Sequence, residues 1–230
     1  MSRQPGERWG QFAERAANAF GLVLVLVIAT FALGSLTALD GWTAVLTVLV
    51  ACSAAVVGLA GAEARPVVLR GAAVLALVAI GLAALAEIVD DAHLLGASAF
   101  ILTTLLLVAA VAVLRAVLIE TEVGFRTILG AISVYTILGL LFTFLYAALD
   151  RVQSDPFFGP GVEVQDGDFL FFSYTTLTTT GYGNLVPADQ PGKMFAGFEM
   201  LMGQIFLVTL VAGLVSLWRP GSIARRRRSE

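Results

Sequence analysis

The sequence predicts an all-α membrane protein with six transmembrane helices and a short re-entrant helix and loop between the fifth and the sixth. Of its 230 residues, 58% are hydrophobic and only 13% are charged, whereas soluble domains contain about a quarter charged residues. The mean hydropathy is +0.89. Six apolar stretches reach the length of about 20 residues that a helix needs to cross a bilayer, whereas a seventh, residues 169–177, is too short.

The six predicted spans divide the chain into four regions. The spans are Ala19–Leu39, Trp42–Gly61, Val67–Val89, Leu94–Ile119, Gly124–Leu149 and Met194–Trp218. The first is long enough to cross and has no small-residue cleavage site, so it is interpreted as a span and not as a cleaved signal peptide. The regions are an interfacial segment 1–18, a four-helix membrane domain 19–120, a second membrane domain 121–218 and a basic tail 219–230.

Basic residues predict the orientation, because loops on the cytoplasmic side carry an excess of Lys and Arg. With the N-terminus inside, twelve of the 14 basic residues are cytoplasmic and only Arg151 and Lys193 are outside. Both termini are therefore expected in the cytoplasm. The protein is expected to lie in the plasma or inner membrane. Residues 9–20 have helical apolar spacing and suggest a helix lying on the membrane surface, with a frayed tail as the alternative. The arginines of the tail are expected to contact anionic lipids.

The stretch TTLTTTGYGN, residues 175–184, places five threonines beside Gly-Tyr-Gly. Inside a membrane, non-helical backbone is tolerated only where it is buried in protein or lines a water-filled cavity. Gly181 and Gly183 can adopt dihedral angles that are closed to other residues. If the backbone alternates in handedness, successive carbonyl groups point the same way. Four such segments around one axis form rings of oxygen that can replace the hydration shell of K⁺.

The surrounding residues carry a resemblance to a known family. FFSYTTLTTTGYGNLVP, residues 171–187, resembles the pore signature of potassium channels, in which Thr-x-Gly-Tyr-Gly-Asp-x-x-Pro follows an aromatic pair and Ser. The resemblance implies a pore helix and a selectivity-filter loop between helices five and six. The implied filter residues are Thr179, Thr180, Gly181, Tyr182 and Gly183. Their first four carbonyls and the Thr179 hydroxyl would coordinate K⁺, the permeant ion and the only cofactor implied.

Two positions depart from the commonest form of this signature. Thr180 replaces Val, which keeps a β-branched residue, and Asn184 replaces Asp, which removes a charge at the outer mouth. The second change puts conductance and inactivation in doubt more than selectivity. Asp166 or Asp168 is expected to cap a short helix over residues 168–178, whose C-terminal end favours a cation at the membrane centre.

The last span resembles the inner helix of these channels. Gly203 lies 21 residues after Tyr182, at the position of the family's gating hinge, and a close-packing contact is the alternative role for this glycine. Glu199 is the acidic residue deepest in this span and needs a partner. It is expected to brace the filter by bonding to Thr175 or Thr176, with a titrating role in opening as the alternative.

Charges elsewhere give weaker signals. Span four contains one arginine, Arg115, near its cytoplasmic end, whereas voltage sensing requires several charges that move through the field. We therefore expect weak or absent voltage dependence. Residues 150–168 have a local net charge of −4, which either concentrates cations at the mouth or forms a solvated turret. Residues 87–93 are expected to form a solvated turn, with a divalent-ion site as the alternative.

Together these features predict a homotetramer that conducts K⁺ passively, since one Gly-Tyr-Gly per chain requires four chains to close a ring. A weakly selective cation channel and a non-conducting subunit are the alternatives within this architecture. An enzyme is not expected, because the single His lies in a loop and no Asp lies inside a span. The single cysteine, Cys52, excludes an intrachain disulfide and is expected to be a small apolar filler. No nucleic-acid partner is expected.

Overall fold

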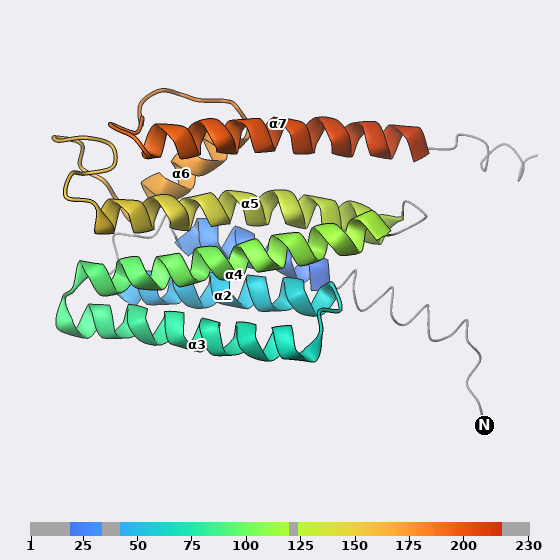
Figure 1. The fold of residues 1–230 in the computed structure, drawn as a ribbon, viewed down its shortest axis with the longest axis horizontal. Helices are drawn as coiled ribbons and strands as arrows, with labels where there is room; N and C mark the ends of the chain where they lie inside the picture. The colour runs from blue at the N-terminus through green and yellow to red at the C-terminus, as the bar shows by residue number, and fades with distance from the viewer. Residues whose placement is uncertain (1–18, 34–41, 120–123, 218–230) are drawn as a thin grey trace, which may run out of the picture.

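The computed structural model describes residues 19–33, 42–119 and 124–217. Within these residues the chain forms seven helices and no strand. They are a first helix Ala19–Leu33, α2 Trp42–Gly61, α3 Pro66–Val89, α4 Ala92–Ile119, α5 Phe125–Val152, α6 Asp166–Leu177 and α7 Gly192–Leu217. The long helices lie side by side and reverse direction from one to the next, and α6 is a short helix between α5 and α7 (Figure 1).

Five helices in the described residues, α2, α3, α4, α5 and α7, are long and apolar enough to cross a membrane. Each of the five predicted spans from Trp42 onward therefore corresponds to a helix of sufficient length and hydropathy. The first predicted span, Ala19–Leu39, appears as the shorter apolar helix Ala19–Leu33, and its remaining residues lie outside the described part of the chain. The predicted interfacial segment 1–18 and basic tail 219–230 also lie outside it.

A seam of alanines packs α3 into the first four helices. The buried residues of α3 recur every three or four positions and are Ala72, Ala76, Ala79, Ala83 and Ala86. Small side chains let helix backbones approach closely in a membrane, where apolar burial gives little driving force. Because the two helices are close here, the Ser98 hydroxyl of α4 donates a hydrogen bond to the carbonyl of Ala79 at 2.8 Å. The thiol of Cys52 is buried in the same seam, 3.9 Å from the carbonyl of Ala76.

The helices α5, α6 and α7 form a second packing unit. The C-terminal end of α5 and the N-terminal ends of α6 and α7 lie at one end of the molecule (Figure 1). The chain therefore enters with α6 and returns to the same end before α7 begins. The first helix also contacts this unit, because the Ser133 hydroxyl of α5 donates to the carbonyl of Phe20 at 3.2 Å.

An aromatic cluster anchors the loop between α5 and α6. Its rings pack within 5.0–6.1 Å of one another and belong to Tyr146, Phe157, Phe158, Phe169 and Phe172. The loop is also hydrogen-bonded at Phe157, whose N–H donates to the Asp150 carboxylate at 2.9 Å and whose carbonyl accepts the Ala188 N–H at 2.9 Å. The segment predicted as a turret is thus fastened to α5 and α6 at its centre.

The helix α6 begins two residues before the predicted start. Gln165 is the N-cap residue, and its backbone N–H donates to the Asp168 carboxylate at 2.9 Å. Asp168 therefore caps from the third helical position, as the acidic partner in a capping box does, and not from the N-cap position that the sequence suggested.

Candidate functional site

The segment that follows α6 has an unusual backbone. Thr179, Gly181 and Gly183 have φ angles of 57°, 49° and 80°, whereas Thr180 and Tyr182 between them lie outside the positive-φ region. Alternation of this kind turns carbonyl groups to one side of a chain. Positive φ suits glycine, but in a β-branched residue it is an outlier that costs about 1–3 kcal/mol. The surroundings of Thr179 must therefore hold it in place.

The last turn of α6 holds the start of this segment. The N–H of Thr179 donates to the Thr176 carbonyl at 2.9 Å, and those of Thr180 and Gly181 donate to the Thr175 carbonyl at 2.8 and 3.0 Å. Thr175 and Thr176 thus contact the segment through their carbonyl groups. The hydroxyl of Thr175 donates instead to the Phe172 carbonyl of its own helix at 3.0 Å.

The outer part of the segment faces away from the rest of the chain. Tyr182 is 71% exposed, and one face of its ring stacks on Phe171 of α6 with the centroids 5.6 Å apart. Asn184 is exposed as well. Residues 178–184 therefore present a polar, non-helical surface that the single chain leaves open.

Behind α6 lies Glu199, whose side chain is completely buried. One carboxylate oxygen accepts the Ser173 hydroxyl of α6 at 2.6 Å, and the other accepts the Tyr146 hydroxyl of α5 at 2.7 Å. A buried carboxyl group without donors would cost several kcal/mol, and here each oxygen has one. Glu199 thus joins α5, α6 and α7 at one point, through Ser173 and Tyr146 and not through the expected hydroxyls of Thr175 or Thr176.

Two further tyrosines fasten α6 to α5. The Tyr174 hydroxyl of α6 donates to the Thr136 carbonyl at 2.6 Å, and the Tyr135 hydroxyl of α5 donates to the Leu177 carbonyl at 3.3 Å. The Tyr174 ring lies where Gly139 leaves room, since a Cβ at that position would stand 2.5 Å from the nearest ring atom. The end of α6 is therefore held at a fixed height against α5.

The inner face of α7 contacts both α6 and the segment that follows it. Gly203 is buried, and a Cβ there would collide with the Leu177 carbonyl oxygen. The adjacent Gln204 donates its side-chain N–H to the Thr179 hydroxyl at 3.1 Å. Close packing therefore accounts for a glycine at position 203, while the hinge role stays a prediction.

Three residues of this arrangement were missed by the sequence analysis as partners, namely Tyr146, Ser173 and Gln204. The polarity of these side chains was the signal in the sequence that could have identified them, because a tyrosine or a glutamine in the middle of an apolar span needs a hydrogen-bond partner. Which partner each one has depends on how α5, α6 and α7 cross.

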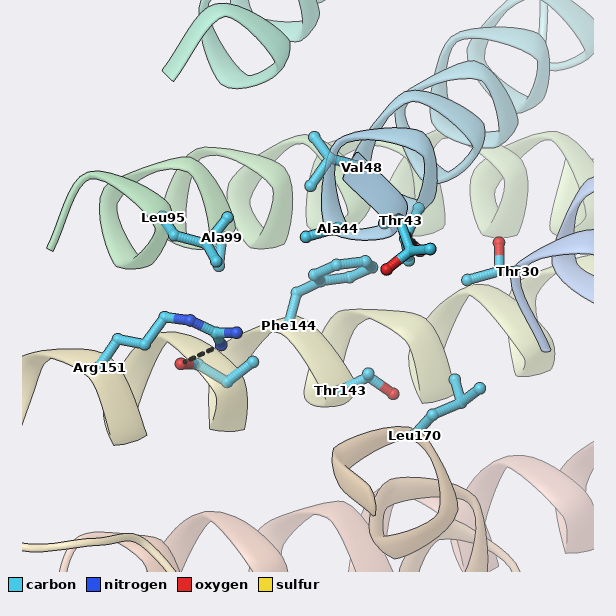
Figure 2. A pocket seen from close by; sticks show the side chains of 12 residues that line it. Thr30, Thr43, Ala44, Val48, Leu95, Ala99, Thr143, Phe144, Arg151 and Leu170 are labelled. Atoms are coloured by element: carbon cyan, nitrogen blue, oxygen red, sulfur yellow. Dashed lines mark hydrogen bonds between the residues drawn. The ribbon is translucent and has the colours of Figure 1, made fainter. Parts of the chain in front are cut away.

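A cavity of about 60 Å³ lies apart from this segment, between α5 and the first helices. Figure 2 shows Phe144 pointing from α5 toward Ala44 of α2. The hydroxyls of Thr30 and Thr143 donate to carbonyls of their own helices at 3.0 and 2.8 Å, and most of the other lining residues are apolar. We interpret it as an apolar seam between two packing units and not as a polar site.

Among the described residues, no group of three or more His, Cys, Asp or Glu side chains is placed to hold a metal ion. The carboxylate of Asp91 accepts the backbone N–H of His93 at 2.8 Å, so Asp91 caps the start of α4, and His93, predicted to lie in a loop, is the second residue of that helix. In the α5–α6 loop, Asp155 and Glu163 are exposed, so their charges face solvent near the open segment.

Comparison with known proteins agrees with this geometry. A family described as ion channel matches residues 133–219. The mouse protein "Potassium channel, subfamily K, member 16" and its human counterpart "Potassium channel subfamily K member 16" are each 44% identical to this chain over 52 residues. That stretch is 21% of this chain and 18% and 17% of the two relatives, so the match spans less than a fifth of either relative. No solved structure matches.

The matched region contains α6, the open segment and α7, along with most of α5. The sequence signature and the apolar helices of this region, and the two relatives that it matches, all indicate an ion-channel domain. Residues 133–219 are therefore similar to an ion-channel domain, and part of this region is similar to two potassium channels, within a chain whose long apolar helices fit a multi-pass membrane protein.

Proposed function

We propose that the protein is a homotetrameric channel that conducts K⁺ passively through a selectivity filter made of residues Thr179–Gly183. The observation that carries the proposal is the alternation of φ along this segment, with positive values at Thr179, Gly181 and Gly183. Repeated around a four-fold axis, carbonyls on one side of the chain form rings that replace the hydration shell of the ion. The Thr179 hydroxyl supplies the innermost ring.

The open surface of the segment supports an assembly of four chains. Residues 178–184 are polar, non-helical and largely exposed in one chain, and a lipid-facing backbone of this kind is not stable in a membrane. Copies of the same segment, related by a closed rotational symmetry, remove it from lipid and surround an aqueous path.

The exposed face of α7 supports the same assembly. Large apolar side chains recur on it at alternating spacings of four and three residues, at Met194, Phe198, Leu201, Ile205 and Val208. This spacing forms a continuous stripe along one side of a helix, as in helices that pack against each other with a small crossing angle. We assign the stripe to contacts between inner helices of neighbouring subunits.

The distribution of charged residues indicates which end of the proposed pore faces outward. Under the orientation that places both termini in the cytoplasm, Asp155 and Glu163 lie on the outer side, where their charges attract cations toward the filter. Arg115 is the only basic residue in α4, and a single charge near one end couples weakly to the field. Opening is therefore proposed to depend weakly or not at all on voltage.

The test is recording from the purified chain in planar bilayers with K⁺ on one side and Na⁺ on the other. A reversal potential close to the K⁺ equilibrium potential, together with block by Ba²⁺, supports the proposal. A reversal potential near zero assigns the protein to weakly selective cation channels, to which the replacements Thr180 and Asn184 point. No current at any voltage overturns the proposal and leaves a non-conducting subunit.

A further inference from the structure

Gln204 is the polar side chain of α7 that contacts the proposed filter directly. Its Nε2 donates a hydrogen bond to Oγ1 of Thr179 at 3.1 Å. Neighbouring threonines behave differently, since the hydroxyls of Thr175 and Thr178 donate to carbonyls of α6. The hydroxyl proposed as the innermost ligand is thus reached by a donor from a separate helix.

The chemistry of this contact affects what the hydroxyl can offer to an ion. A threonine hydroxyl has one proton and two lone pairs. The amide of Gln204 occupies one lone pair, which fixes the direction of the other and turns the hydroxyl proton away from the donor. A cation that approaches along the pore axis then meets an oriented lone pair and not a freely rotating hydroxyl.

The backbone makes this support necessary. Thr179 is β-branched and has a φ of 57°, a conformation that persists only where surrounding contacts hold it. The backbone of Thr179 is held by the Thr176 carbonyl, and its side chain by Gln204. Gly203 sets the distance, because its lack of a side chain lets α7 approach the end of α6 at this level.

We propose that Gln204 is a positioning residue for the innermost K⁺ site, so that ion affinity and ion discrimination at this site depend on the side chain at position 204. The inference rests on the proposed function and adds to it a determinant outside the filter sequence. Four copies of the amide would form a ring directly below the filter, each fixing one Thr179 hydroxyl.

The experiment compares Gln204→Met with the wild-type channel in bilayers. Methionine keeps the length and volume of the side chain but removes the donor. We expect the affinity for Ba²⁺ applied from the cytoplasmic side to fall about fivefold, the factor that corresponds to one ordinary hydrogen bond, and the Rb⁺/K⁺ permeability ratio to change. Thr209→Val is the matched control, because its hydroxyl on α7 bonds to the Ile205 carbonyl of its own helix at 2.6 Å. It should leave both readouts unchanged.

A double-mutant cycle with Thr179→Val shows whether Gln204 acts through the hydroxyl, because coupled residues give non-additive effects. Gln204→Met should then have no further effect on Ba²⁺ affinity. Unchanged block and permeability in Gln204→Met overturn the inference while K⁺ conduction, and with it the proposed function, stands.

A second measurement does not require current. K⁺ bound to the filter raises the thermal stability of the assembled protein by mass action. The K⁺ concentration for half-maximal stabilisation should rise in Gln204→Met and stay unchanged in Thr209→Val. Equal values in wild type and Gln204→Met contradict the inference even if no variant conducts.

Discussion

Glu199 places a carboxyl group in the interior of a membrane domain and provides each of its oxygens with a hydroxyl donor. Three helices meet at this side chain, and α6 cannot shift along α5 or α7 without lengthening one of the two hydrogen bonds. The same pair of bonds explains why the group is tolerated, since polar residues at membrane depth are stable when they pair with other groups of the protein. The side chain therefore fixes the height of α6 against its two neighbours.

Two replacements of Glu199 distinguish the contribution of its side-chain shape to stability from the contribution of its hydrogen bonds. Glu199→Gln keeps an acceptor and adds a donor, so the assembled protein should form and keep its thermal stability. Glu199→Val leaves the buried hydroxyl of Tyr146 without its partner, which costs about 1–3 kcal/mol, whereas the Ser173 hydroxyl keeps the Gly139 carbonyl at 2.8 Å. Thermal unfolding of the detergent-solubilised protein measures the difference. Equal stability of the valine variant and the wild type would contradict a bracing role.

Gly203 tests close packing against hinge bending. The Cβ of Gly203→Ala collides with the Leu177 carbonyl oxygen, and such overpacking destabilises by about 1–3 kcal/mol. We expect a lower unfolding temperature for this variant. Gly197→Ala is the control on the same helix, because no atom lies within 4 Å of its added Cβ. A Gly203→Ala protein with unchanged stability but altered open probability would assign the glycine to the hinge.

At the scale of elements, α6 depends on the loop that precedes it. Phe157 is 3% exposed and contacts Tyr146, Phe158, Phe169 and Phe172. Truncation of a buried phenylalanine costs about 3–5 kcal/mol, so Phe157→Ala should increase hydrogen–deuterium exchange in α6 and lower stability. Val162→Ala changes an exposed residue of the same loop and should do neither. Unchanged exchange in α6 would show that the loop does not support the helix.

The charge content of α4 predicts how conductance depends on voltage. Arg115 is exposed near the C-terminal end of α4, where a long basic side chain can reach the membrane interface. Arg115→Gln should leave the conductance–voltage relation in symmetric K⁺ unchanged, with less than about one gating charge per subunit in both proteins. A steep relation in the wild type that flattens in Arg115→Gln would make α4 a voltage sensor.

At the scale of the whole molecule, the segment after α6 and the helix α7 lie on the side of the chain farthest from α3 (Figure 1). The first helices cover the other side of α5, and α7 packs mainly against α6 and α5. One side of the pore domain is thus buried within the chain and the other is available to further copies.

The assembled mass tests this arrangement. Native mass spectrometry should give four times the chain mass of 24.2 kDa, because one filter segment per chain closes a ring only in fours. Leu201→Arg, in the α7 stripe, should reduce the tetramer fraction, since a charge at an apolar helix contact in the membrane is costly. A dominant mass of one or two chains would contradict the homotetramer.

Much of the architecture could be predicted from composition and length. The ends of α2 were predicted correctly, and those of α3, α4 and α5 to within a few residues, because the length of an apolar run is set by bilayer thickness. The start of α6 was misplaced, since several acidic residues compete for its cap. The partners of Glu199 were also misassigned, because the α6 hydroxyl that reaches its carboxylate is that of Ser173, nearer the start of the helix, whereas the Thr175 hydroxyl donates to the Phe172 carbonyl.

The sequence by itself determined the membrane spans, the short helix and the residues of the filter signature, because hydropathy and glycine placement act locally along the chain. Tertiary structure alone decided that Tyr146, 53 positions before Glu199, and Ser173, 26 positions before it, meet the same carboxyl group. It also decided that Gln204 reaches Thr179, 25 positions earlier. These contacts arise where three helices cross. No periodicity in the sequence specifies how far each helix is shifted along its axis relative to the helices that it packs against.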